Sequence, residues 1–152
     1  MSVITKLKQP RKGPFTTWPH PNCFVCSEAN RQGLHLEFIL AEDDSVSASF
    51  CSKNGFEGYP GILHGGIISS IVDGAMINWL FAHEVVAVTA ELNVRFRSPV
   101  AIGRMATVRA KILRSDSPLY VVEAKITQDG KVKIAATGKF LEKPQAFTPV
   151  GL

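Results

Sequence analysis

The chain has 152 residues, of which 45% are hydrophobic and 20% charged, and its net charge is +4. This length suits one domain with a single core, and the composition is that of globular proteins rather than of disordered or disulfide-stapled chains. The 17 Lys and Arg are scattered, apart from a small cluster within residues 6–12. A nucleic-acid-binding surface is therefore disfavoured, whereas a phosphorylated ligand is allowed.

The first fifteen residues contain no apolar stretch of the length that a secretory signal requires. We also expect no segment to be apolar enough to cross a bilayer. A cytoplasmic location is therefore expected. Three cysteines, an odd number in such a chain, favour reduced thiols over a disulfide framework.

Residues 1–33 are expected to form an N-terminal arm. Four of the nine prolines lie in its first 22 residues, which show no sustained hydrophobic period. The side chains of Phe15 and Trp18 are expected to pack onto the domain. The arm ends with a CFVC segment at residues 23–26.

Two short strands and one long helix are expected next. Residues 34–40 alternate apolar and polar side chains, as a half-buried strand does, and residues 46–50 repeat the pattern after an acidic turn, which predicts a hairpin. A Gly/Pro cluster then interrupts regular structure. Residues 65–82 are apolar on nearly all sides, which predicts a buried helix, and at ~1.5 Å per residue it would be roughly 27 Å long.

Four more runs with a period of two follow, at residues 86–97, 105–113, 119–127 and 131–141. Turn sequences separate them, and Asp129-Gly130 is a strong signal for a two-residue hairpin. The expected architecture is α+β, a mostly antiparallel curved sheet of five to six strands wrapped around one long central helix. This domain is expected over residues 34–145, with a tail at 146–152.

The loop before the predicted helix has the residues of an anion-binding helix start. His64, Gly65 and Gly66 open the helix, whose first backbone N–H groups have no partner within it. The amide of Gly65 or Gly66, aided by the helix dipole, could donate to a carbonyl oxygen that becomes an oxyanion during acyl transfer. The alternative is a glycine-rich turn that only admits the chain to a crowded helix.

Asp73 is a carboxylate in the middle of this apolar helix. Burial raises the pKa of a carboxyl toward the range of a general base, and such groups are enriched at functional sites. The alternative is a structural carboxylate that accepts hydrogen bonds from a neighbour. Asp73 lies nine residues after His64, ~13 Å along a helix, so one chain cannot bring both to one carbonyl. A composite site in a two-fold dimer is therefore expected.

The segment GILHGGIISSIVDGAM at residues 61–76 resembles the signature of hotdog-fold acyl-CoA thioesterases of the phenylacetate-pathway type, in which HGG opens the central helix and an acid follows nine residues after the His. The segment VTAELNVRFRSP at residues 88–99 is similar to the next strand of that family, and the resemblance covers residues 34–142. It implies a hotdog fold and a homo-oligomer, a dimer or a dimer of dimers, that hydrolyses acyl-CoA to a free acid and CoA. No cofactor and no metal are expected.

The resemblance also implies roles for individual residues. The Gly65 amide would polarise the thioester carbonyl, and Asp73 of the partner chain would act as base or nucleophile. Thr89 would help to place the lytic water, while His64 would mainly shape the turn.

The candidate substrate-binding residues are Gly66, Gly58, Asn93, Arg95 and Arg97. Many family members have an Asn six residues before the His, where this chain has Gly58, a departure that resembles a subgroup close to the mammalian members with a Gly-Pro-rich loop. Arg95 and Arg97 alternate with apolar residues, so both are expected on the strand face opposite the core. There they would either bind the phosphates of CoA or form a solvated face.

The CFVC segment at residues 23–26 is similar to an N-terminal feature of some bacterial hotdog thioesterases, with Ser27 in place of a Gly. Its two thiols, with His20 and His35, offer up to four zinc ligands, but a second C-x2-C or H-x3-H pair is missing. Buried reduced thiols are therefore expected rather than a metal site.

Two other functions fit part of this pattern. An acyl-CoA-binding module that senses or regulates would not need Asp73, whose presence favours an enzyme. A hydroxyacyl-thioester dehydratase would need a catalytic His placed with an acid on the helix, but only His83 follows the HGG segment. The sequence does not determine whether the acyl group is aromatic or aliphatic. The side chains that could line its pocket are Met76, Trp79, Phe81 and Phe96.

Overall fold

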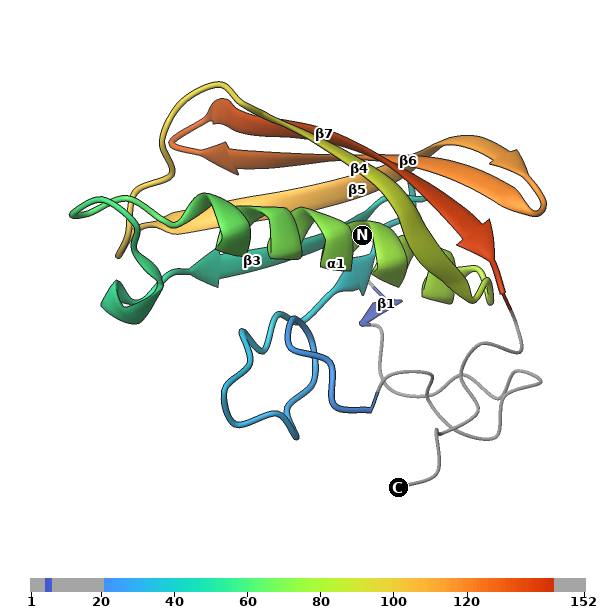
Figure 1. Ribbon diagram of the computed structural model, residues 1–152, viewed down its shortest axis with the longest axis horizontal. Coiled ribbons are helices and arrows are strands. Elements are labelled where there is room, and N and C mark those ends of the chain that lie inside the picture. Colours follow the sequence, from blue (N-terminus) through green and yellow to red (C-terminus); the bar gives the residue numbers. More distant parts are fainter. Residues whose placement is uncertain (1–4, 7–20, 144–152) are drawn as a thin grey trace.

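The computed structural model describes residues 5–6 and 21–143, in which one helix lies against one face of an antiparallel sheet (Figure 1). The helix is α1 (Gly65–Ala82). The strands are β1 (Thr5–Lys6), β2 (Ile39–Leu40), β3 (Val46–Cys51), β4 (Ala87–Phe96), β5 (Met105–Asp116), β6 (Leu119–Gln128) and β7 (Lys131–Glu142), and a short 3-10 helix, η1 (Asn54–Phe56), follows β3.

The strands are arranged in the order β1-β2-β3-β5-β6-β7-β4, and each described pairing is antiparallel. Strand β4 follows the helix but pairs with β7 rather than with its chain neighbour β5, so β4 forms one edge of the sheet. The predicted α+β hotdog architecture is confirmed. The count of five to six strands omitted β1, a two-residue strand in the segment that was expected to be an arm.

The core lies between α1 and the concave face of the sheet. Strands β5, β6 and β7 alternate buried and exposed residues over most of their length, and α1 buries ten of its eighteen residues. The helix approaches β7 closely at Gly138, where an added Cβ would lie 2.7 Å from Sδ of Met76. An added Cβ here would also lie 2.6 Å from Cε2 of Phe140, so the side chains of Met76 and Phe140 would have to move.

The sequence was expected to contain no segment apolar enough to cross a bilayer, and α1 contradicts this expectation. Its 18 residues have a mean hydropathy of 1.3 and are long and apolar enough to cross a membrane by length and composition alone. In this fold 56% of the helix is buried. The apolar surface of α1 therefore packs in the core, and a core helix passes the same test of length and hydropathy.

The CFVC turn packs on the side of α1 that faces away from β5, β6 and β7 (Figure 1). Val25 is buried, and an added Cβ on Gly74 in the middle of α1 would lie 2.6 Å from Cγ1 of Val25. The turn is closed by a hydrogen bond from the Ser27 amide to the Cys23 carbonyl. Phe15, Trp18 and the tail at 146–152 lie outside the described residues.

The predicted strand at 34–40 is wrong over most of its length, because only Ile39–Leu40 pairs within the sheet. The amides of Leu34 and Leu36 donate instead to the carbonyls of Phe24 and Val25, at 2.7 and 2.9 Å. The alternation of burial still holds, since Leu36 is buried and His35 exposed. The chain here is extended but bonds to the CFVC turn. The predicted hairpin of β2 with β3 is confirmed.

Candidate active site

The start of α1 leaves the backbone amide of Gly65 available. His64 is the N-cap residue, and its Nδ1 accepts a hydrogen bond from the Gly66 amide at 2.9 Å. The Ile68 amide donates to the His64 carbonyl and begins the helical ladder. Within residues 21–143 the Gly65 amide has no acceptor. Of the two amides considered from the sequence, Gly65 is therefore the one that can bind an oxyanion at the positive end of the helix.

The loop that presents this amide is held on several sides. The His64 amide donates to the Phe56 carbonyl, and the Leu63 amide donates to the Val100 carbonyl, each at 2.9 Å. The Glu57 carboxylate accepts from the Gly61 amide, also at 2.9 Å. Gly61 has a φ of +77°, a left-handed conformation that favours glycine.

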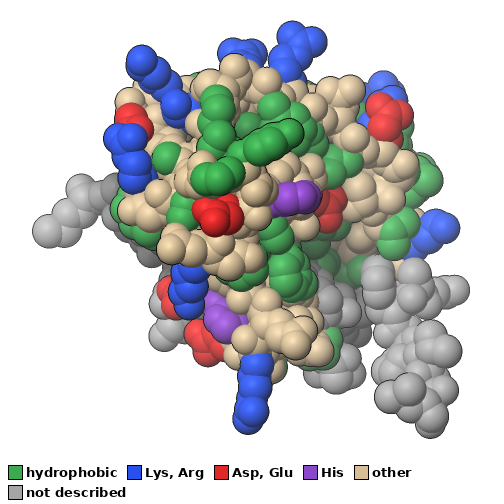
Figure 2. All heavy atoms as spheres, turned by 60° about the vertical axis from the view of Figure 1, so that its left-hand side comes forward, with side chains coloured by type: hydrophobic (Ala, Val, Ile, Leu, Met, Phe, Trp, Pro, Cys, Tyr) green, Lys and Arg blue, Asp and Glu red, His purple; other side chains and the backbone are tan. Residues whose placement is uncertain are grey.

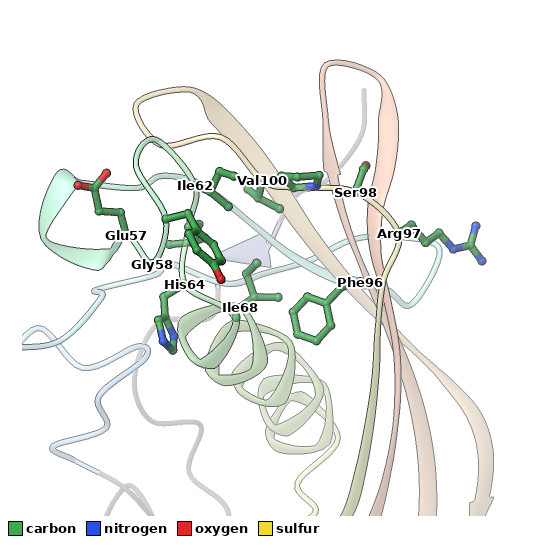
Figure 3. A pocket seen from close by; sticks show the side chains of 13 residues that line it. Glu57, Gly58, Ile62, His64, Ile68, Phe96, Arg97, Ser98 and Val100 are labelled. Carbon is green, nitrogen blue, oxygen red and sulfur yellow. The ribbon is translucent and has the colours of Figure 1, made fainter.

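A pocket of about 880 Å³ opens at this end of α1. Ile62, Ile68, Phe96 and Val100 converge on it, whereas Glu57 and Arg97 point away (Figure 3). The remaining lining residues are Gly58, Tyr59, Leu63, His64, Gly65, Ser98 and Pro99. Hydrophobic side chains also gather on the surface of this end of the molecule (Figure 2).

Gly65 forms part of the pocket wall beneath an aromatic ring. An added Cβ on Gly65 would lie 3.4 Å from Cε1 of Phe96, an ordinary van der Waals contact, so the ring lies close to this glycine. Phe96 itself is 52% exposed although it lies on the concave face of β4. An acyl group that enters the pocket would therefore meet both the Gly65 amide and the face or edge of this ring.

Asp73 lies half-buried in the middle of α1, next to Thr89 on β4. The Thr89 hydroxyl donates to Oδ1 of Asp73 at 2.7 Å. Burial raises the pKa of Asp73 above its usual range, the hydrogen bond from Thr89 lowers it, and the Coulombic interaction with Cys23 raises it. The structure thus brings Asp73 and Thr89 together, as a carboxylate and the hydroxyl that donates to it.

The amide and the carboxylate lie far apart on one chain. Asp73 follows His64 by nine residues along one continuous helix, ~13 Å at ~1.5 Å per residue. Neither Asp73 nor Thr89 lines the pocket that contains Gly65. The available amide and the half-buried carboxylate therefore lie at two separate places on the same chain.

The predicted polar groups of β4 point outward. Asn93 and Arg95 are exposed on the convex face, where they pair in register with Thr137 and Ala135. Arg97 continues this face just beyond β4, at the rim of the pocket. Within residues 21–143 neither arginine makes a salt bridge. Of the candidate substrate-binding residues, only Gly58 and Arg97 line the pocket.

A model of the thioesterase superfamily matches residues 60–135, which are 76 of the 152 residues. The chain belongs to the thioesterase superfamily. It is 35% identical over 110 residues to a proposed esterase of Saccharolobus solfataricus, covering 70% of this chain and 78% of that protein. It is 24% identical to an acyl-coenzyme A thioesterase of Rattus norvegicus over 73% of this chain, but it spans only 50% of the length of that enzyme.

Solved thioesterase-superfamily structures share the fold. The E. coli PaaI protein from the phenylacetic acid degradation operon superposes with a TM-score of 0.69 at 18% identity, covering 76% of this chain and 85% of that one. A hypothetical thioesterase of Streptococcus pneumoniae, solved with coenzyme A, superposes with a TM-score of 0.63 at 17% identity, covering 65% and 78%. The family resemblance seen in the HGG segment is confirmed.

In this superfamily member the three cysteines are free thiols. The hydrogen bond with Cys23, together with burial, raises the pKa of the Cys26 thiol. No three His, Cys, Asp or Glu residues lie together as metal ligands within the part of the chain that the structure describes, and His20 lies outside it.

Some residues around the site differ from the sequence expectation. Met76 and Trp79 lie in the core rather than in a pocket, and the Trp79 indole N–H donates to the Asp44 carbonyl at 2.7 Å. Of the four side chains that were expected to line the acyl pocket, which also included Phe81, only Phe96 lines the pocket. Tyr59 and Val100 were missed. The Gly/Pro cluster and the Ser98-Pro99 turn indicated only that these segments are loops.

Proposed function

We propose that this protein is an acyl-CoA thioesterase that hydrolyses its substrate to a free acid and CoA at a site shared by two subunits. One observation carries the proposal. The Gly65 amide is available beside an apolar pocket, while Asp73, the carboxylate suited to act as base, lies ~12 Å away along the same rigid helix.

The chemistry needs only these two groups. The Gly65 amide donates to the thioester oxygen, and Asp73 takes a proton from water as the water oxygen bonds to the carbonyl carbon. The carbon–sulfur bond then breaks, and the CoA thiolate leaves and is protonated. Direct attack by the Asp73 carboxylate is the alternative first step. A general base contributes typically ~10²- to 10⁴-fold and one oxyanion donor about 10²- to 10³-fold.

The position of β4 supports a two-fold dimer. Its first residues include Thr89, beside Asp73, and its last residue is Phe96, beside Gly65. Because β4 is an edge strand, its outer side is a template for pairing with another strand. Antiparallel pairing of β4 with the same strand of a second copy would place the Thr89 end of one chain at the Phe96 end of the other. The Gly65 amide and the partner's Asp73 would then face one thioester.

CoA as the leaving group is supported by the rat relative, which is an acyl-CoA thioesterase, and by the neighbour that was solved with coenzyme A. The two exposed arginines of the β4 segment carry no salt bridge among the described residues and could pair with the phosphates.

A screen of aryl-, short- and long-chain acyl-CoAs for released thiol tests this function. We expect the purified protein to release thiol from at least one class, with free CoA among the products. Binding of CoA in calorimetry without thiol release from any substrate would instead indicate an acyl-CoA-binding module.

A further inference from the structure

Gln128, the last residue of β6, has a buried side chain that is 2% exposed. Its Oε1 accepts a hydrogen bond from the Ala101 amide at 2.8 Å. Its Nε2 donates to the carbonyls of Ala101 and Arg104, at 3.1 and 3.3 Å. A primary amide has two N–H donors, so both donors of Gln128 are used on one loop. The other inward residues of β6 are Tyr120, Val122, Ala124 and Ile126.

The loop that Gln128 binds is attached on its other side to the loop that carries the candidate oxyanion site. Ala101 forms an isolated antiparallel bridge with Ile62. The hydrogen bonds of this bridge run from the Leu63 amide to the Val100 carbonyl and from the Ile102 amide to the Gly61 carbonyl, each at 2.9 Å. In such a pair the N–H and C=O of Ala101 face away from Ile62, and they meet the Gln128 side chain.

We propose that Gln128 is a positioning residue that holds the Gly65 amide where it donates to the thioester oxygen. This inference rests on the proposed function. The contacts run from Gln128 to Ala101, across the bridge to Leu63, and from there through His64 to the first residue of α1. Because a misplacement of about 1 Å can cost ~10²-fold in rate, a loop that shifts even slightly would weaken catalysis.

The hydrogen bonds distinguish this role from simple core packing. Gln128 does not line the pocket and so does not contact the substrate there. An apolar residue would fill the same space, but it would leave the N–H and C=O groups of Ala101 without their partner, a loss that favours movement of the loop. A polar side chain in a buried position costs free energy unless its hydrogen bonds are made, and those of Gln128 are all made to this loop.

Gln128→Met tests the proposal, since Met has a similar length and makes none of the three hydrogen bonds. The matched control is Val122→Ala, a destabilising change at a fully buried position on the same face of the same strand. We expect Gln128→Met to lower kcat at least about 10-fold with a smaller change in KM, and Val122→Ala to retain kcat below its melting temperature. In amide NMR spectra the Leu63 and Gly65 resonances should shift in Gln128→Met and not in Val122→Ala.

Gln128→Glu provides a second variant if Gln128→Met does not fold. Burial beside two carbonyl oxygens favours the protonated carboxyl, which can accept from the Ala101 amide and donate to one carbonyl but not to both, so its kcat should fall between those of wild type and Gln128→Met. A kcat no lower than that of Val122→Ala, with the Leu63 and Gly65 amides unmoved, would overturn the proposal. An inactive wild type would contradict the proposed function instead, and the spectra would still test the coupling between Gln128 and Gly65.

Discussion

At the residue scale, the proposed function rests on Gly65 and Asp73, which lie apart on one helix. Gly65 offers a hydrogen-bond donor without a side chain, and Asp73 offers an acceptor whose pKa is raised by burial. Each feature alone has an ordinary structural explanation. Together with the thioesterase-superfamily fold, they support the proposed oxyanion site and base.

Asp73→Asn should lower kcat by at least about 10²-fold, because it removes the base but keeps the shape and an acceptor for the Thr89 hydroxyl. The variant should not be less stable at neutral pH. The folded state holds the Asp73 proton more tightly than the unfolded state does, so the free energy of unfolding falls as the pH rises through this window, and Asn removes that cost. Turnover by purified, folded Asp73→Asn close to that of wild type would end the catalytic assignment.

The acidic limb of kcat/KM should lie above the range of an ordinary aspartate, because Asp73 must lose its proton to act as a base. Thr89→Val removes the hydrogen bond that lowers the pKa of Asp73, so the limb should move to higher pH. Thr137→Val, the same change on the exposed face of β7, is the control and should leave the limb in place. Equal pH profiles for the two variants would show that Thr89 does not tune the base.

The candidate catalytic residues could be selected from the sequence because a carboxylate in an apolar helix and an HGG segment at its start are unusual. Several residues that line the pocket or hold its loops could not. Tyr59 and Val100 lie on loops without a period, and Gln128 looks like an ordinary polar residue before a turn. Only the folded chain shows that these residues support one helix end.

At the scale of elements, the predicted helix agrees with α1 at both ends, because its run of apolar residues is bounded by the HGG segment and by polar residues. Strand β5 was predicted to end at 113 but continues to Asp116. A bulge between Ile112 and Arg114 shifts the alternation there, so a search for a strict period of two ends the predicted strand too early. The predicted strand at 34–38 is wrong for the opposite reason. Its residues alternate in burial as a strand does, but its backbone hydrogen bonds go to the CFVC turn.

Gly74→Ala should destabilise the protein even though Ala is favoured over Gly within helices by about 1 kcal/mol. The added Cβ would lie 2.6 Å from Cγ1 and 3.0 Å from Cβ of Val25, so the CFVC turn must move. Denaturant midpoints of the two single variants and of the double variant with Val25→Ala measure this contact. We expect the double variant to lose less stability than the sum of the two singles, and an additive result would mean that the turn adjusts without cost.

At the scale of the whole molecule, the pocket opens at one end of the sheet and the arginines of the β4 segment lie on the convex face beside it. The double variant Arg95→Ala and Arg97→Ala should raise KM for acyl-CoA more than it lowers kcat, since the phosphates of CoA lie remote from the thioester. Lys111→Ala, at an exposed position on the same face of β5, is the control. Calorimetry that finds unchanged CoA affinity would make these arginines a solvated strand face.

The shared site is the central claim, and mixing two inactive variants tests it most directly. Gly65→Pro removes the amide at the first residue of α1, where Pro is tolerated, and His64 already has a φ of −60° and a ψ of 135°, which suit a residue before Pro. Asp73→Asn removes the base from the other half of the site. In a heterodimer of the two, one of the two sites would be intact.

Random exchange of equal amounts makes half of the dimers hetero, so the mixture should recover about a quarter of the wild-type activity if both variants fold and exchange freely. Native mass spectrometry would establish that heterodimers are present. No recovery above the activity of the separate variants, with folded heterodimers present, would show that Gly65 and Asp73 do not act together on one thioester across the subunit interface.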